Sequence, residues 1–535
     1  MTEDANQRTG ILTRIVHRQS FIVYLTALAA VARLMLVRET PINWDAVQFE
    51  LALSRFDLSA HQPHPPGYIL YVLAGRALKL LLGEPGLALS LLSVLAAAAA
   101  VPFLYRLALD ILNDKGVALG AALLLLASPL ALYYGSVALT YAPEMLGSIA
   151  VAWLAWRARG SAAWPLVVAL AIALGLLGGV RQTALLVLLP LCVWALSDRN
   201  RGKSAALRQL GLFGLSLAAT CLLWLVPLLA LSGGLTAYLR ENALLASSVS
   251  ARTSIFGAGI GGLGYNIAFE AMALGVGLAF AVLPLGLWAL RLVRFSLARD
   301  LKAFLAWWAL PALGLYALSH VGQYGYLLVV LPPCALLAAV CARVLVERFA
   351  GREALAPVAG ALACAVLALA SGAYFAFAQG PTTAANITGN DAHWRAVRLM
   401  LSHEDPTSTA LLASESWGAS FRTAGYLLPA FHTYAAGEGT GDAYGWLYSA
   451  YGGRSDYRLP RPPAQPELDL PPGTHKVIAL DQEVAEKFGK GQEPRPVTLA
   501  DGSTVYISQS EGSDIAALML RQDRLWAVYN QAAGR

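Results

Sequence analysis

The chain has 535 residues, of which 57% are hydrophobic and only 13% are charged. A soluble globular protein carries about 25% charged residues, so this composition excludes a protein that lives in water alone. The net charge of +6 does not indicate a nucleic-acid partner, because the Lys and Arg residues stand in short clusters between apolar runs. The five cysteines lie inside apolar segments without C-x-x-C spacing, so they indicate neither a disulfide framework nor a zinc site.

The first apolar run begins near Ser20 and lacks a small-residue cleavage pattern, so we interpret it as a retained membrane span. A membrane helix needs about 20 mostly apolar residues. Eleven runs meet this requirement: 20–37, 87–109, 117–135, 143–157, 163–180, 184–197, 208–232, 266–290, 303–319, 325–346 and 354–379.

A twelfth run, 67–83, is short and contains Arg76 and Lys79. If this run does not span and the N-terminus lies inside, the Lys- and Arg-rich segments between spans all fall on the cytoplasmic side, as the positive-inside rule requires. We therefore predict that 67–83 is an amphipathic or re-entrant segment at the outer surface. The segments that this choice places inside are 106–115, 157–159, 198–203, 291–302 and 343–352.

These spans predict two regions: a transmembrane part, 1–379, with a large outer first loop at 38–86, and a polar tail, 380–535. The tail is long enough for its own core. Strand-like runs at 476–479 and 504–507, and helical patterns at 391–402 and 513–530, indicate a mixed α/β domain. The expected fold class is a polytopic α-helical membrane protein of about eleven transmembrane helices with a C-terminal soluble mixed α/β domain.

Ionisable side chains are concentrated in the first outer loop. Asp45, Glu50, Asp57, His61 and His64 lie within about 20 residues of one another. Ionisable groups at membrane depth are costly to bury and usually face a cavity. A run of prolines ending in glycine stiffens the backbone beside the histidines. The alternative is a solvated loop with turn-forming prolines.

An Asp soon after the first span, followed by the element Pro63-His64-Pro65-Pro66-Gly67-Tyr68, resembles the first periplasmic loop of GT-C integral membrane glycosyltransferases. The most similar branch contains the protein O-mannosyltransferases and the aminoarabinose transferase of lipid A. The resemblance covers about the first 350 residues and extends to the order of spans and outer regions. It implies transfer of a sugar from a polyprenyl phosphate to a hydroxyl group at the outer face of the membrane, with inversion.

The resemblance implies that Asp45 is the general base that takes the proton of the acceptor hydroxyl. The alternative for Asp45 is the N-cap of a helix that begins at Ala46. Many family members have an Asp-Glu pair here, whereas Ala46 follows Asp45 in this sequence, so Glu50 and Asp57 compete for the second carboxylate.

His61 and His64 would bind the acceptor or the donor phosphate. They could also hold a divalent metal with Asp45, but their spacing matches no defined motif. The relatives are thought to work without a metal, so we expect neither a metal nor another cofactor.

The departing polyprenyl phosphate needs cationic or hydrogen-bonding partners, which other outer loops can supply. Arg181 could grip a phosphate through two parallel hydrogen bonds, or it could simply extend to the interface. Glu144 follows a proline at a helix start, which the helix dipole alone would explain. The loop 233–265 has the composition of a lid or of a plain connector. Further candidates for binding donor or acceptor are Tyr68, Gln182, His320, Gln323 and Tyr324, and, in the tail, Trp417 and Arg422.

We also considered a transporter or flippase of a lipid-linked substrate, and a membrane assembly protein without catalysis. A transporter should show paired broken helices in two similar halves, which this sequence does not display. The expected partners are the lipid bilayer, a polyprenyl-phosphate sugar and an unknown hydroxyl acceptor on a protein, lipid or glycan. The expected location is the inner (plasma) membrane, with the N-terminus cytoplasmic and the tail periplasmic.

Overall fold

The computed structural model describes residues 19–161, 163–197, 202–292, 295–350, 356–414, 420–438, 467–510, 514–519 and 526–531. The chain divides into two compact units. The first, which we call the helical unit, comprises Met1–Val37 and Tyr68–Asn386. The second, the mixed unit, comprises Arg38–Gly67 and Ile387–Arg535, so the start of the first loop is grouped with the tail. The functional domain limits predicted at 1–379 and 380–535 stay a prediction.

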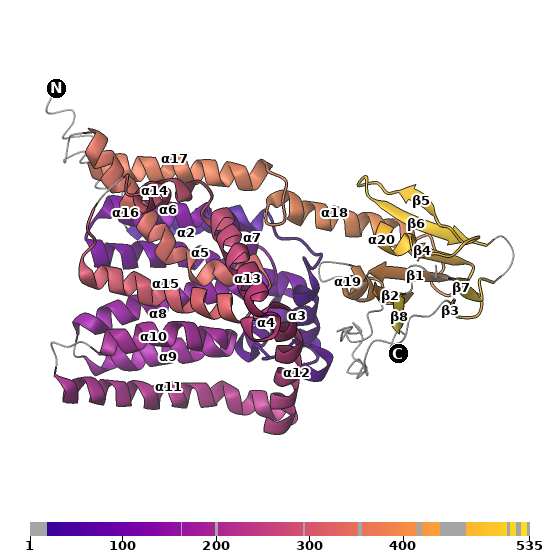
Figure 1. Cartoon of the computed structure of the whole chain (residues 1–535), viewed down its shortest axis with the longest axis horizontal. Helices are drawn as coiled ribbons and strands as arrows, with labels where there is room; N and C mark the ends of the chain where they lie inside the picture. Colours follow the sequence, from indigo (N-terminus) through magenta and orange to yellow (C-terminus); the bar gives the residue numbers. More distant parts are fainter. Residues whose placement is uncertain are drawn as a thin grey trace. The chain divides into compact units, whose positions relative to one another are not determined.

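The helical unit is built of long apolar helices (Figure 1). Among the described residues, five of its helical segments are long and apolar enough to cross a membrane: α5, α11, α15, α17 and the run from α13 to α14. Every predicted span overlaps a helix, while the count of eleven spans stays a prediction. The elements are α2 (Gln19–Leu34), α4 (Ile69–Leu82), α5 (Pro85–Leu112), α6 (Lys115–Leu126), α7 (Pro129–Tyr134), α8 (Tyr141–Gly160), α9 (Trp164–Val180), α10 (Thr183–Leu196), α11 (Lys203–Leu231), α12 (Leu235–Thr253), α13 (Ile255–Leu278), η3 (Ala279–Ala281), α14 (Val282–Ala289), α15 (Arg299–Leu318), η4 (Tyr324–Val329), α16 (Leu331–Ala350) and α17 (Ala356–Phe377).

The predicted span 117–135 is two helices, α6 and α7, rather than one. Pro129 begins α7 and cannot donate a backbone hydrogen bond, which ends the preceding helix. The fully buried Arg33 of α2 covers the break, where its guanidinium donates to the carbonyls of Leu126 and Ala131 at 3.3 and 3.2 Å. A buried cation thus donates to backbone oxygens on both sides of the helix break.

Ion pairs join the segments that the charge pattern assigns to the cytoplasm. Arg159 lies 3.0 Å from Asp300, and Arg343 lies 3.4 Å from Asp114. Both pairs connect segments that are distant in sequence but on the same predicted side. The pairs support a bundle in which alternate loops share one end, and which end faces outward stays a prediction.

Small residues bring α9 and α11 close together. A Cβ atom at Gly175 would lie 2.8 Å from the side chain of Thr220, and one at Gly179 would lie 2.9 Å from the ring of Trp224. The Trp224 indole also donates to the carbonyl of Gly175 at 2.8 Å. Glycines four residues apart therefore form the flat surface on which α11 packs.

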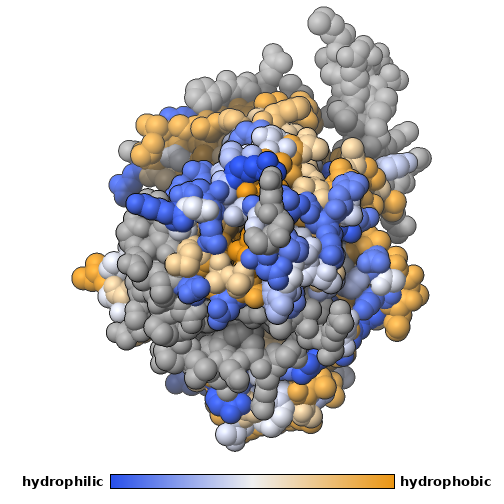
Figure 2. All heavy atoms as spheres, turned by 90° about the vertical axis from the view of Figure 1, so that its right-hand side faces the viewer, coloured by the Kyte–Doolittle hydropathy of each residue, from blue (hydrophilic) through white to orange (hydrophobic). Residues whose placement is uncertain are grey.

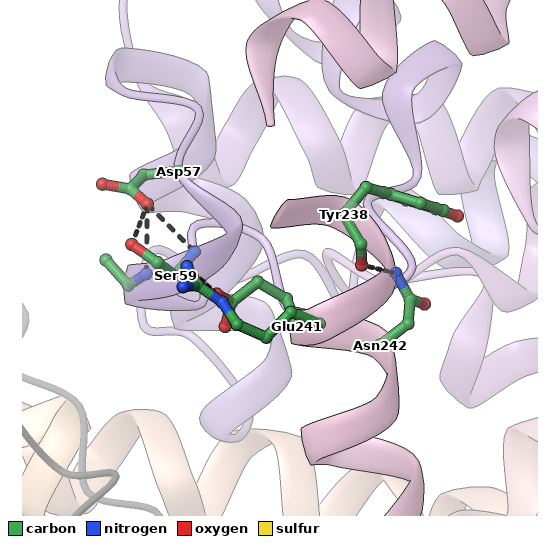
Figure 3. Close-up of polar contacts among 7 residues, drawn as sticks. Asp57, Ser59, Tyr238, Glu241 and Asn242 are labelled. Carbon is green, nitrogen blue, oxygen red and sulfur yellow. Dashed lines mark hydrogen bonds and ion pairs between the residues drawn. The ribbon is translucent and has the colours of Figure 1, made fainter. Parts of the chain in front are cut away.

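The segment proposed as a flexible lid, 233–265, is helical over most of its length. It forms α12 and the first turns of α13, with a kink at Gly259, where φ is 62°. Within α12, the Asn242 amide donates to the carbonyl of Tyr238 at 2.8 Å (Figure 3). The glycine-rich composition therefore does not produce an irregular loop here.

The mixed unit contains a six-stranded sheet with the order β5-β6-β4-β1-β2-β8. The central strand β1 runs parallel to β2 and β4, and the remaining pairs are antiparallel. Besides α3 and η1 from the first loop, the elements are α18 (Ala384–Leu401), β1 (Thr409–Ser414), α19 (Ser420–Leu427), β2 (His432–Glu438), β3 (Glu467–Asp469), β4 (Lys476–Ala479), α20 (Gln482–Ala485), β5 (Arg495–Thr498), β6 (Thr504–Gln509), β7 (Ala517–Met519) and β8 (Trp526–Gln531).

The tail holds strands and helices together, as the sequence predicts, and β4 and β6 match the two predicted strands. The predicted helix at 513–530 is wrong, because β7 and β8 lie there. Hydrophilic side chains are frequent on the face of the molecule drawn in Figure 2. The membrane helices, in contrast, expose apolar residues such as Leu223 and Phe256.

Candidate functional site

Asp45 stands in the first turn of α3 (Trp44–Ser54). The N-cap of this helix is Asn43, whose side-chain oxygen accepts from the Ala46 amide at 3.0 Å. The alternative interpretation of Asp45 as the N-cap is therefore wrong. Its side chain is 22% exposed, so the carboxylate remains accessible while its neighbours on α3 are mostly buried.

His64 lies against the same face of α3. Its Nδ1 is 3.8 Å from Asp45 Oδ1, and its ring centroid is 5.4 Å from that of Phe49, one turn along the helix. The 3.8 Å separation is too long for a direct hydrogen bond but within the range of an ion pair. Around His64, the Gln62–Pro63 and Pro65–Pro66 bonds are cis, and Gly67 has a φ of 111°, a conformation that favours glycine.

The two candidates for a second carboxylate have different surroundings. Oδ1 of Asp57 accepts hydrogen bonds from the amides of Ser59 and Ala60 and from the Ser59 hydroxyl, at 2.7–3.2 Å (Figure 3). Its other oxygen pairs with Arg55 at 2.8 Å. These contacts make Asp57 the cap of the short helix η1 (Leu58–Ala60), whereas Glu50 is buried on α3. Asp57 is nearly as exposed as Asp45, at 18% against 22%, but both of its oxygens are engaged in these contacts.

The backbone of the His61 corner is held by Arg422 of α19. Nη2 of Arg422 donates to the carbonyls of Ala60 and His61, both at 3.2 Å, and its guanidinium carbon lies 5.3 Å from the centre of the Trp44 ring. The Arg422 side chain is fully buried, so the suggestion that it faces a sugar is wrong. Trp417, the other tail candidate, lies outside the described residues. His61 itself is buried and adopts a left-handed φ of 50°.

A second set of contacts within the mixed unit fixes the beginning of the loop. Asp391 of α18 accepts from the Thr40 hydroxyl at 2.8 Å and pairs with Arg395 at 3.0 Å. The neighbouring Asn390 donates to the carbonyl of Pro41 at 3.2 Å. Trp44 also packs into one core of the mixed unit with Trp394, Leu411 and Phe421. The segment that carries Asp45 and His64 is therefore structurally part of the tail's domain.

In the helical unit, Arg181 and Glu144 form a buried ion pair. Arg181 follows α9 and Glu144 begins α8, and the distance from Nε to Oε2 is 3.1 Å. Nη1 of Arg181 also donates to the Thr140 hydroxyl at 3.0 Å. Burial disfavours the charge of Arg181, but the Glu144 carboxylate and the neighbouring tyrosines together outweigh this and raise its pKa above the ordinary value. Arg181 is thus a buried, permanently charged group rather than one that extends to the interface.

Tyrosine rings surround the Arg181 guanidinium. Its central carbon lies 4.5 Å from the ring centres of Tyr141 and Tyr326 and 5.9 Å from that of Tyr68. Stacking of a cation on aromatic faces stabilises it where water is scarce. Sequence reasoning selected Tyr68, Glu144 and Arg181 but missed Tyr141 and Tyr326. Both stand close in sequence to selected residues, Glu144 and Tyr324, but their proximity to Arg181 is visible only in the fold.

The other candidates of the helical unit fall into two groups. Nδ1 of His320 lies 2.9 Å from the Thr253 hydroxyl, and its ring is 6.1 Å from that of Tyr326, which links it to the Arg181 group. The Tyr324 hydroxyl instead contacts Met272 at 3.3 Å on α13. The remaining two begin helices: Gln182 caps α10 and Gln323 caps η4.

No cluster of three or more His, Cys, Asp or Glu side chains suited to a metal ion occurs in the described part of the chain. The expectation of metal-free chemistry therefore stays a prediction.

Comparison with known proteins gives a family match over part of the chain and a shared fold. Residues 50–205 match the family described as "Protein O-mannosyl-transferase TMEM260 N-terminal domain". No curated protein matches the chain. The structure of ArnT from Cupriavidus metallidurans bound to undecaprenyl phosphate is similar over 93% of this chain and 99% of that chain, with a TM-score of 0.56 and 13% identity. The apo structure of the same ArnT covers 91% and 98%, with a TM-score of 0.53 and 13% identity.

The fold shared with ArnT extends over both the helical and the mixed part of the sequence, since nearly the whole of each chain is covered. The family match begins at residue 50, within α3, and includes His64, Glu144 and Arg181. Together they confirm the resemblance drawn from the first loop: residues 50–205 match an O-mannosyl-transferase domain, and the chain as a whole shares the fold of ArnT.

Proposed function

We propose that the chain transfers a sugar from a polyprenyl-phosphate donor to a hydroxyl acceptor at the outer face of the membrane. The observation that carries this proposal is the fold shared with ArnT, a protein whose structure has been solved with undecaprenyl phosphate bound. The match to an O-mannosyl-transferase domain supports a glycosyl group as the moiety that is moved.

Asp45 is the proposed general base. As the acceptor oxygen forms a bond to the anomeric carbon, its proton passes to the Asp45 carboxylate, and the bond from that carbon to the phosphate oxygen breaks. The polyprenyl phosphate leaves with the bonding electrons. One such displacement inverts the anomeric centre. His64 Nδ1 lies 3.8 Å from the carboxylate and helps to position it.

Arg181 is the proposed partner of the donor phosphate. Glu144 and the tyrosine rings fix its guanidinium in one orientation, so it can meet developing charge without rearrangement. Guanidinium groups bind phosphate oxygens through two parallel N–H bonds, which a lysine at this position would not reproduce.

The test is transfer from radiolabelled polyprenyl-phosphate sugars by the purified, reconstituted chain. Asp45→Asn should express and fold normally and lose at least about 100-fold in turnover, the usual contribution of a positioned base. Asp405→Asn is the matched control, since Asp405 lies in the mixed unit and its carboxylate accepts hydrogen bonds from the neighbouring Thr407. If Asp45→Asn turned over at the wild-type rate, Asp45 would not be the general base.

A further inference from the structure

Two polar side chains, Asn266 and Glu270, lie on the buried face of α13. Asn266 is fully buried and Glu270 is 7% exposed. They interrupt an otherwise apolar helix that is long enough to cross a membrane. An ionisable residue in such a helix is costly, so its presence indicates a function and calls for a partner.

Both amide hydrogens of Asn266 are already used. Its Nδ2 donates to the carbonyl of Thr253 at 2.9 Å and to that of Ala317 at 3.1 Å. Only the amino group can donate to carbonyls, so these bonds fix which end of the amide is oxygen. Oδ1 then points away from both, and within the described residues it has no hydrogen-bond partner.

Glu270 presents a second acceptor to the same place. Its Oε1 is buried and likewise lacks a hydrogen-bond partner among the described residues, where Glu270 also makes no ion pair. Side chains four residues apart lie on one helix face, and helical side chains lean toward the N-terminus. The Glu270 carboxylate therefore extends toward the turn that carries Asn266.

This pair is connected to the cationic group of the helical unit. Asn266 binds the carbonyl of Thr253, whose hydroxyl lies 2.9 Å from His320. The His320 ring neighbours Tyr326, which stacks on Arg181. One connected set of contacts thus has a fixed cation at one end and, at the other, two oxygens that find no hydrogen-bond partner among the described residues.

We propose that Asn266 and Glu270 accept hydrogen bonds from the hydroxyl groups of the donor's sugar. A polyprenyl-phosphate sugar combines an anionic phosphate, which suits Arg181, with several hydroxyl donors, which suit the two oxygens. The inference rests on the proposed function, and it adds a subsite that reads the sugar rather than the lipid phosphate.

The test compares binding of two kinds of probe by the full chain in nanodiscs: undecaprenyl phosphate alone, and undecaprenyl phosphates carrying mannose, glucose or arabinose. The wild type should prefer one of the glycosylated probes over the bare phosphate. Glu270→Leu should reduce this preference by roughly tenfold or more, and Glu270→Gln, which keeps one oxygen, by less. Binding of bare undecaprenyl phosphate should stay unchanged in both variants.

Glu347→Gln is the matched control, because Glu347 is a carboxylate of α16 that pairs with Arg343. An unchanged sugar preference in Glu270→Leu would overturn the subsite, and so would an equal loss of bare and glycosylated probes. A wild type that binds bare phosphate but prefers no sugar would overturn the subsite alone. A wild type that binds neither kind of probe would overturn the proposed function as well.

Discussion

Replacement of Arg422 by alanine should loosen the segment 55–66, around His61, within the mixed unit. The change removes two hydrogen bonds from a buried cation to the carbonyls of Ala60 and His61, and the stacking on Trp44. Hydrogen bonds to charged groups are each worth roughly 1.5–3 kcal/mol, and the two partner carbonyls lose their donor. After allowance for the cost of burying the guanidinium, we expect a loss of about 3 kcal/mol, the lower end for a broken buried charge network.

Hydrogen–deuterium exchange of the intact chain in micelles measures this loss locally. A free energy of about 3 kcal/mol corresponds to roughly a 100-fold faster exchange of amides at 55–66. Arg422→Lys should fall between wild type and alanine, because one ammonium cannot present the guanidinium fork. Arg395→Ala is the control, since this exposed partner of Asp391 should contribute at most about 1 kcal/mol. Unchanged exchange at 55–66 in Arg422→Ala would refute the reasoning.

Three further outcomes are expected. Glu144→Gln leaves the Arg181 charge buried without a counter-ion, so thermal unfolding in micelles should show a loss of about 3–5 kcal/mol, part of which Arg181→Gln should restore. Gly175→Val would collide with Thr220 and should separate α9 from α11, detected as a lower unfolding temperature. Burial lowers the pKa of His393 despite the nearby Asp501 carboxylate, so the mixed unit should lose stability as the pH falls below about 6.5.

The sign of the pH effect follows from proton binding. With a lowered folded pKa, the unfolded state binds the proton more tightly, so the contribution of His393 is present above its unfolded pKa and is lost on acidification. His393→Gln should make the unfolding temperature less dependent on pH between pH 7 and 5. An equal dependence in wild type and variant would contradict this.

For the ion pair of Glu144 and Arg181, a double variant no more stable than Glu144→Gln alone would contradict the coupling of the two residues. Gly264→Ala should be neutral, because a Cβ there meets no atom within 4 Å.

Much of the architecture could be predicted because hydrophobic run length is a local property. Each predicted span has its helix, and even the short segment 67–83 appears as the separate helix α4. Prediction from local sequence patterns failed where a neighbouring residue or a distant strand determines the structure. The cap of α3 is Asn43 and not Asp45, two positions away, because the helix begins at Trp44. The stretch 513–530 has a helical pattern, yet pairing with distant strands makes β7 and β8 extended.

The sequence identified many residues of the candidate site, but not which of them contact one another. Arg181 and Glu144 were each noted, while their ion pair spans 37 positions of sequence and leaves no local trace. In the 3₁₀ helix η4, Tyr326 rather than Tyr324 contacts the Arg181 guanidinium. Which tyrosine does so depends on the three residues per turn of this helix type, which the sequence does not reveal. Arg422 was noted for its charge, but its contact with the first loop crosses 361 positions.

Because the first loop belongs to the same unit as the tail, it can reach its folded structure only after the tail has been synthesised. Thr40 and its partner Asp391 are 351 residues apart, and Ala60 and Arg422 are 362 apart. At roughly 5–20 residues per second, a ribosome needs about 20–70 s to travel that distance. During this time the segment with Asp45 and His64 has been synthesised but its supporting domain has not. Any activity that depends on those two residues therefore begins only after the last membrane helix has been made and the tail has folded around the loop.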